Sequence, residues 1–230
     1  MPGRPRWQYH EPYQRTGRTI RKSHTAGRGH PFVGARPYRL PCRAAPVAAC
    51  NGDMHTEPQI TQTPRLGHYE IDVSQSRVTF RTRHMFGLGP VRGTFAIRSG
   101  SADIAEPLAD SAIHAEIDTA SFSTGNKQRD RNVLSARFLD AARFPVISFR
   151  DGLVCADGRT IRGTLTVREV CRPVSLSIGQ VTVAGPSFTA SATVRVDRTE
   201  FGLTAMPGLA GRYLDLTVEV RCARGGTAHA

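Results

Sequence analysis

Apolar and polar residues alternate along most of the chain beyond residue 68, which is the pattern of strands that bury one face. The clearest case is residues 77–84, where Val78, Phe80, Thr82 and His84 share one side and mainly basic or hydroxyl residues occupy the other. Phe80 and His84 are therefore expected to face the interior. Similar alternation predicts further strands at 68–73, 91–97, 111–118, 146–149, 161–167, 173–178, 187–196 and 214–222.

One stretch between residues 111 and 179 has a helical pattern and interrupts these strands. Asn126 is a good N-cap, and about two helical turns can follow before apolar Leu134. Phe138 precedes a short turn that carries Asp140, and Pro145 ends any helix and starts an extended run. Residues 126–149 are therefore expected to form a lid or plug on the sheet.

The number and spacing of the strands predict an all-β fold. About eight short strands, one helical insertion and no alternation of strands with helices favour an extended antiparallel, lipocalin-like β-barrel, since closure removes exposed edges. A β-sandwich is the competing fold. An eight-stranded barrel is wide enough for one small apolar ligand, and the small inward residues Ala190 and Ala192 leave room for it.

Composition divides the chain into a leader, residues 1–64, and a barrel domain, residues 65–226. Up to Asp53 the leader holds ten Lys and Arg against two acidic residues, and it is rich in Pro and Gly. Such a segment is expected to be disordered, and residues 1–53 are interpreted as an over-extended gene start before Met54. The alternative is an RNA-binding arm that uses Trp7 and Tyr9, which ranks below disorder.

The cysteines and the lack of a long apolar run bear on the compartment. Five scattered cysteines show no metal-ligand spacing, and buried free thiols are favoured over a disulfide framework. No stretch is long enough to span a bilayer, and no convincing signal peptide precedes the barrel. The expectation is a cytoplasmic protein without cofactor or metal. The oligomeric state stays open, with a homodimer as one possibility.

Several groups of residues stand in the order and spacing of a known family. They are Ile71-Asp72 with Ser76, Val78, Phe80 and His84; Gly93-Thr94-Phe95; Arg129-Asp130 with Leu134 and Phe138; Phe144-Pro145 with Ile147 and Phe149; Gly163-Thr164-Leu165-Thr166 with Arg172-Pro173-Val174; and Arg198 with Phe201 and Gly202. Over residues 68–224 the chain resembles the YceI-like family, bacterial proteins that hold polyisoprenoid or other long amphiphilic lipids inside an antiparallel barrel. Relatives usually carry His at the position of Asn132, which puts a head-group contact there in doubt, and often Gly near Glu169.

The resemblance implies a ligand site made of inward apolar residues. The predicted ligand-binding residues are Phe80, His84, Phe86, Phe95, Ile97, Ile113, Ile117, Leu134, Phe138, Phe149, Leu165, Leu176, Val194 and Phe201. The competing interpretation is that they fill a solid core. The loop residues Leu88, Leu203, Met206 and Leu209 are expected to line or gate a mouth. His84 has two open roles: a hydrogen bond to a polar lipid head, or a core histidine bonded to the backbone.

Few polar residues are candidates for a functional or structural role. Arg129 and Asp130 are expected to be structural: Asp130 supports the helix start and pairs with an arginine, while Arg129 holds the segment on the sheet. No nucleophile elbow, His-x-His pair or phosphate loop is present in the sequence, so catalysis is not expected. A hydrolase or isomerase that uses His84 in the same cavity is the alternative function.

Overall fold

The structure is a computed structural model, and it describes residues 63–84 and 87–224. Almost all of the predicted leader and the candidate Phe86 lie outside the described residues. The expectations of a disordered leader, an RNA-binding arm and a ligand contact by Phe86 therefore stay predictions.

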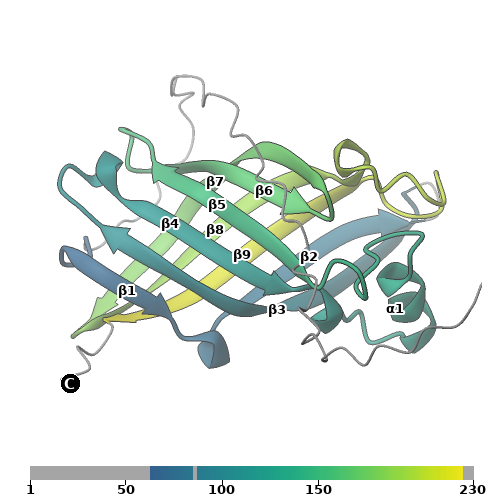
Figure 1. Ribbon diagram of the computed structural model, residues 1–230, viewed down its shortest axis with the longest axis horizontal. Helices are drawn as coiled ribbons and strands as arrows, with labels where there is room; N and C mark the ends of the chain where they lie inside the picture. The colour runs from purple at the N-terminus through teal and green to yellow at the C-terminus, as the bar shows by residue number, and fades with distance from the viewer. Residues whose placement is uncertain (1–62, 85–86, 225–230) are drawn as a thin grey trace, which may run out of the picture. The chain divides into compact units, whose positions relative to one another are not determined.

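The described residues form nine strands in one antiparallel sheet, in the order β1-β3-β2-β9-β8-β7-β6-β5-β4 (Figure 1). Their bounds are β1 (Gly67–Ile71), β2 (Arg77–His84), β3 (Gly89–Ile104), β4 (Ala112–Asp118), β5 (Val146–Val154), β6 (Thr160–Val167), β7 (Val170–Ala184), β8 (Ser187–Asp197) and β9 (Tyr213–Arg224). The helix α1 (Lys127–Leu134) and the 3₁₀ turns η1 (Val73–Gln75), η2 (Leu108–Asp110), η3 (Thr119–Ser121) and η4 (Arg198–Phe201) complete the elements. Pairing of β3 with β4 closes the sheet into a barrel.

Around the barrel the nine strands occupy eight positions. β1 and β2 lie one after the other in the same position, between β3 and β9. Tyr69 of β1 pairs with Ala102 of β3 and with Arg224 of β9. Phe80 of β2 pairs with Gly93 of β3 and with β9 on its other side. The turn η1 separates the two strands and has Asp72 as its cap. The predicted barrel of about eight strands is confirmed, and the sandwich alternative is wrong.

Two strands are longer than the alternation predicts. β3 continues to Ile104 and β7 continues to Ala184, whereas the predicted strands end at Ile97 and Ile178. The pairing register shifts between Ile97 and Ser99, and again between Ile178 and Val181. Because a β-bulge breaks the two-residue period, the second half of each strand is out of phase with the first.

Four connections meet at one end of the barrel, which we call the helix end. They are the β2–β3 turn, the β4–β5 connection with α1, the β6–β7 turn and the β8–β9 connection with η4. Figure 1 shows α1 and the β8–β9 connection together at the right-hand side. The predicted helical insertion is confirmed: the Asn126 side chain accepts hydrogen bonds from the backbone N–H groups of Gln128 and Arg129, at 3.1 Å and 3.0 Å.

The buried side chains form two apolar clusters. The first lies toward the helix end and consists of Val78, Phe80, Val91, Phe95, Ile97, Phe122, Leu139, Ile147, Val167, Val196, Phe201 and Leu203. The second lies toward the opposite end and consists of Tyr69, Ala102, Val181, Phe188 and Cys222. Ile71 and Val220 pack against both clusters. Apolar side chains therefore run through the barrel from one end to the other.

Of the cysteines, Cys222 is a buried free thiol, and burial raises its pKa to about 12. Cys155 and Cys171 are each disulfide-bonded. The prediction of free thiols is therefore wrong for these two, because spacing along a sequence does not reveal which cysteines meet in space. The compartment stays a prediction. No helix in the described ranges is long and apolar enough to cross a membrane.

A charged cluster joins β1 to β3 and gives a pH-dependent contribution to stability. His68 Nε2 lies 2.8 Å from Glu70 Oε1, and Nδ1 lies 2.6 Å from Asp103 Oδ1. Hydrogen bonds to Glu70 and then to Asp103 raise the pKa of His68 above its ordinary value of 6.5. The stabilisation is therefore fully present below pH 6.5 and is lost as the pH rises through the higher folded-state pKa.

We expect the thermal midpoint of the wild type to fall over this window, and the fall to be smaller in His68→Gln. Thermal unfolding followed by circular dichroism from acidic to alkaline pH measures it. Gln180→Ala, an exposed position on β7 that removes no titrating group, is the control and should keep the wild-type slope. Identical slopes in the wild type and His68→Gln contradict the assignment.

Candidate functional site

The inward faces of β7, β8 and β9 make an apolar wall. Across β8 and β9 the facing pairs are Val194 with Leu216, Ala192 with Val218, and Ala190 with Val220. On β7, Leu176 and Ile178 belong to the same side, since Ile178 pairs with Ala192. Most of these residues are only half-buried, although their strands are paired on both sides. The wall is thus apolar along its length and incompletely covered.

Aromatic rings on the inner face lie against glycines of the same strand or of a neighbouring strand. A Cβ added at Gly93 would come 2.5 Å from Cζ of Phe80. A Cβ at Gly152 or at Gly163 would come equally close to the Phe149 ring. The rings therefore lie along the inner surface of the barrel, in the space that a side chain at each glycine position would fill. This arrangement keeps large apolar side chains away from the barrel axis.

Three rings form an aromatic group near the helix end. Phe80 stacks on Phe122 with centroids 5.3 Å apart and planes 15° apart. Phe95 lies 5.8 Å from Phe80 and 5.2 Å from Phe122. Phe122 was not among the predicted residues, because it follows η3 in a connection without strand or helix periodicity. Its flanking serines, Ser121 and Ser123, gave no signal of burial.

Most predicted ligand-binding residues come together in the first cluster. Those in it or packed against it are Phe80, Phe95, Ile97, Ile117, Leu134, Leu165, Val194 and Phe201. Ile113 packs against the second cluster. Leu176 is half-buried on the inner side of β7, Phe149 is buried between its glycines, and Phe138 is buried at the helix end. The structure gives positions for these residues, and ligand contact by each stays a prediction.

His84 lies at the rim of the barrel at the helix end. It is the last residue of β2, and its register partner is Gly89 at the start of β3. The imidazole ring occupies the space next to Gly89 that a Cβ would need. The residue is half-buried, so it belongs to the mouth and not to the deep interior.

The predicted gate residues differ in their exposure to solvent. Leu203 is buried in the first cluster, whereas Leu88 is 83% exposed and Leu209 is 48% exposed. Met206 is half-buried. Leu203 is thus part of the core, and two leucines project from the connections of the helix end.

Arg129 and Asp130 fasten the helix to the preceding connection through Thr124. Asp130 Oδ1 accepts hydrogen bonds from Thr124 N at 3.0 Å and Thr124 Oγ1 at 2.5 Å. Arg129 Nε donates to Thr124 Oγ1 at 2.7 Å. The adjacent Ser123 exchanges backbone hydrogen bonds with Thr94 of β3. Both side chains hold the helix against the sheet, although the contact of Asp130 is with Thr124 and not the expected arginine.

Arg198 is a buried arginine that holds the β8–β9 connection. Its Nε donates to Gly211 O at 2.7 Å, its Nη2 donates to Ala210 O at 3.1 Å, and its Nη1 donates to Leu203 O. Burial lowers the pKa of Arg198, and the charge of Asp197 opposes this. In the sequence, Arg198 was identified only as one of the residues that resemble the family, together with Phe201 and Gly202, and no role was predicted for it.

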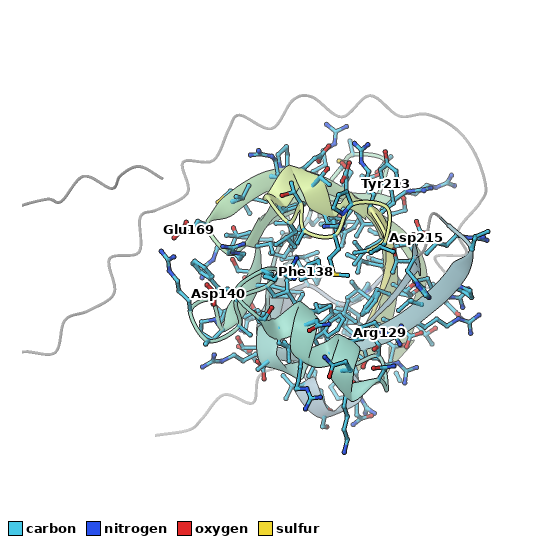
Figure 2. The ribbon with its side chains drawn as sticks, turned by 90° about the vertical axis from the view of Figure 1, so that its right-hand side faces the viewer. Arg129, Phe138, Asp140, Glu169, Tyr213 and Asp215 are labelled. Carbon is cyan, nitrogen blue, oxygen red and sulfur yellow. The ribbon has the colours of Figure 1, made fainter. Side chains whose placement is uncertain are left out.

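Phe138 joins the helical cap to this connection. The Arg198 guanidinium lies 5.7 Å from the centroid of the Phe138 ring, and Arg168 Nη1 donates to Phe138 O at 3.2 Å. Arg143 and Glu169 form an ion pair of 2.8 Å between the cap and the β6–β7 turn. Figure 2, a view onto the helix end, shows Phe138 near the centre, with Asp140 and Glu169 to one side. The cap therefore covers part of the barrel end.

Groups of three or more His, Cys, Asp or Glu side chains that could hold a metal do not occur in the described part of the chain. The interior presents apolar surface, with His84 at its rim. A barrel with this interior can enclose an apolar molecule, and a polar end of that molecule would lie near the mouth.

The described part of the chain is thus a small closed antiparallel barrel with an apolar interior and a short helical cap. The chain belongs to the YceI-like domain family, whose sequence profile matches residues 69–222. The resemblance inferred from the motifs is thereby confirmed.

The chain is also similar to curated relatives in sequence and to solved structures in fold. A UPF0312 protein of Enterobacter sp. (strain 638) is 34% identical over 165 residues, which cover 66% of this chain and 84% of the relative. BcnA of Burkholderia cenocepacia is similar in fold, with 18% identity, a TM-score of 0.57, and coverage of 66% of this chain and 98% of BcnA. A polyisoprenoid binding domain from Saccharophagus degradans aligns with 12% identity and a TM-score of 0.49, over 70% of this chain and 100% of that domain.

Proposed function

We propose that the barrel binds one long amphiphilic lipid of the isoprenoid type, for transport or sequestration. The observation that carries this proposal is that apolar side chains run through the barrel, because Ile71 and Val220 pack against both clusters. A long unbranched or prenyl chain matches such an interior, because each buried methylene contributes about 0.8 kcal/mol. Membership in the YceI-like family supports the same ligand class.

The polar end of the ligand is expected at the helix end. His84 lies at the rim there, and its ring nitrogens can bond to a quinone oxygen or a phosphate. Asn132, in the last turn of α1, is exposed, so it does not take part in the apolar wall. Because the tail supplies most of the binding energy, we expect loose recognition of the head group and tolerance of chain length.

Solvent extraction of the purified protein followed by mass spectrometry tests the proposal. The expected result is co-purification of a prenyl lipid, or uptake of a prenyl quinone analogue by the delipidated protein. Repeated absence of lipid together with no uptake of the analogue overturns it.

A substitution inside the barrel locates the site. Ala190→Phe adds a ring to the inner wall between Val181 and Val220, and it is expected to lower uptake of the analogue at least tenfold. Thr189→Phe places the same ring on the exposed face of the same strand and is the control. Equal uptake by both variants shows that the ligand does not bind in the interior.

A further inference from the structure

Charge is distributed unequally between the two ends of the barrel. The described residues within 81–92, 118–145, 168–172 and 195–215, which we call the helix-end surface, carry thirteen Lys and Arg against seven Asp and Glu. The other described residues carry eight Lys and Arg against nine Asp and Glu. Ten of the thirteen cations are exposed, but only three of the seven acids are. The helix-end surface therefore presents positive charge to solvent.

A row of charged side chains crosses four strands on the outside of this surface. Arg92 of β3 pairs in register with Arg81 of β2, Arg81 with Asp215 of β9, and Asp215 with Arg195 of β8. Asp215 Oδ1 lies 3.7 Å from Arg195 Nε, and the two side chains form an ion pair. The row thus holds three arginines and one carboxylate, and Asp215 is opposite two of the arginines, Arg81 and Arg195. Because like charges directly opposite each other destabilise a sheet, the Arg81–Arg92 pair favours an external anion.

Apolar side chains project next to these arginines. Leu88 in the β2–β3 turn is 83% exposed, and Leu209 in the β8–β9 connection is 48% exposed. The two connections lie side by side, since Gly211 packs against the backbone of Arg83 and Thr82 Oγ1 donates to Tyr213 O at 2.6 Å. Exposed leucines beside arginines form a surface that is apolar at its tips and cationic around them. Such a combination suits the boundary between lipid head groups and acyl chains.

We propose that the helix-end surface docks the barrel on an anionic lipid bilayer. Leu88 and Leu209 insert among the acyl chains, and Arg81 and Arg92 contact lipid phosphates. Docking at this end places the mouth at His84 toward the membrane, so a lipid tail can enter the barrel without crossing water. The inference rests on the proposed lipid-binding function for its purpose. A nucleic acid is the less suitable partner, because it offers nothing for the exposed leucines to bury against.

Vesicle flotation with the full-length protein tests the docking surface. The probes are vesicles of phosphatidylcholine alone and vesicles in which about one third of the lipid is phosphatidylglycerol. Binding is expected only to the anionic vesicles at about 0.1 M salt and is expected to weaken at about 0.5 M salt. Residues 1–62 are also basic, so every comparison is between full-length variants that share them.

Two double variants and their matched controls separate this surface from the rest of the chain. Arg81→Gln/Arg92→Gln is expected to lower partitioning onto anionic vesicles about 30-fold, and Arg98→Gln/Arg159→Gln, outside this surface, should change it less than threefold. Leu88→Ser/Leu209→Ser is expected to lower partitioning about tenfold. Leu153→Ser is its control, because Leu153 has a similar exposure of 45% and lies on β5 outside the helix-end surface.

Wild-type partitioning in both helix-end variants overturns the proposal, as does an equal loss in the controls. Loss of single-stranded RNA binding in Arg81→Gln/Arg92→Gln without loss of vesicle binding also overturns it. Lipid content, measured by extraction, distinguishes the proposal of a docking surface from the proposal of an interior lipid site. A wild type that carries lipid while both helix-end variants float like the wild type refutes only the docking surface. A wild type that floats as expected but carries and takes up no lipid refutes only the interior site.

Discussion

Phe80→Ala is expected to lower the free energy of unfolding by about 4 kcal/mol. The ring is 3% exposed, stacks on Phe122 and contacts Phe95. Its neighbour on the adjacent strand is Gly93, which has no side chain to fill the space that the ring leaves. The substitution therefore removes apolar contacts and leaves a cavity that the backbone cannot close. Urea unfolding followed by circular dichroism measures the loss.

Val73→Ala serves as the control, because Val73 is 45% exposed in η1. Its effect is expected to stay within about 0.5 kcal/mol. A loss of less than about 1 kcal/mol for Phe80→Ala contradicts the proposed packing of the aromatic group.

Arg198→Met is expected to lower the free energy of unfolding by about 3 kcal/mol. Methionine has a similar length, but it leaves the carbonyl groups of Leu203, Ala210 and Gly211 without their donor. Hydrogen exchange is expected to rise across residues 203–211, since these bonds hold the connection against the barrel. Urea unfolding gives the stability, and exchange followed by mass spectrometry gives the local effect.

Arg195→Met is the matched control on the same strand. Its side chain is 66% exposed and its ion pair with Asp215 is 3.7 Å long, so a loss within about 1 kcal/mol is expected. Equal losses for Arg195→Met and Arg198→Met show that the three carbonyl contacts contribute little.

The strands and the helical insertion were predictable because one side of each strand is buried. Phe80, with Val78 before it and Thr82 after it, keeps the two-residue period from end to end of β2. The extensions of β3 and β7 were not predictable, because their bulges reverse the phase of the pattern. Alternation identifies which side chains face inward, but it does not locate a change of register.

Alternation predicted the candidate site only where it lies on strands, whereas Leu134, Phe138 and Phe201 were predicted through the family resemblance. Phe122 belongs to a connection, and it reaches the interior because Ser123 pairs with Thr94 and fixes the chain over the barrel end. Arg198 is charged, and nothing in its local sequence indicates that three carbonyl groups surround it. Burial of such a residue depends on the path of the β8–β9 connection, which the strand pattern does not determine.

The pairing of β2 with β9 has a consequence for synthesis of the protein. Arg77 bonds to Glu219, 142 positions later in the chain, with Nε 2.7 Å from Oε2. The hairpins from β3 to β9 can form between consecutive strands as the polypeptide emerges, whereas the seam beside β2 has to wait for the last strand. Until β9 leaves the ribosome, β2 and β8 present open backbone edges and the apolar wall is exposed to water. These edges are therefore open to association with other chains until the C-terminal strand has been made.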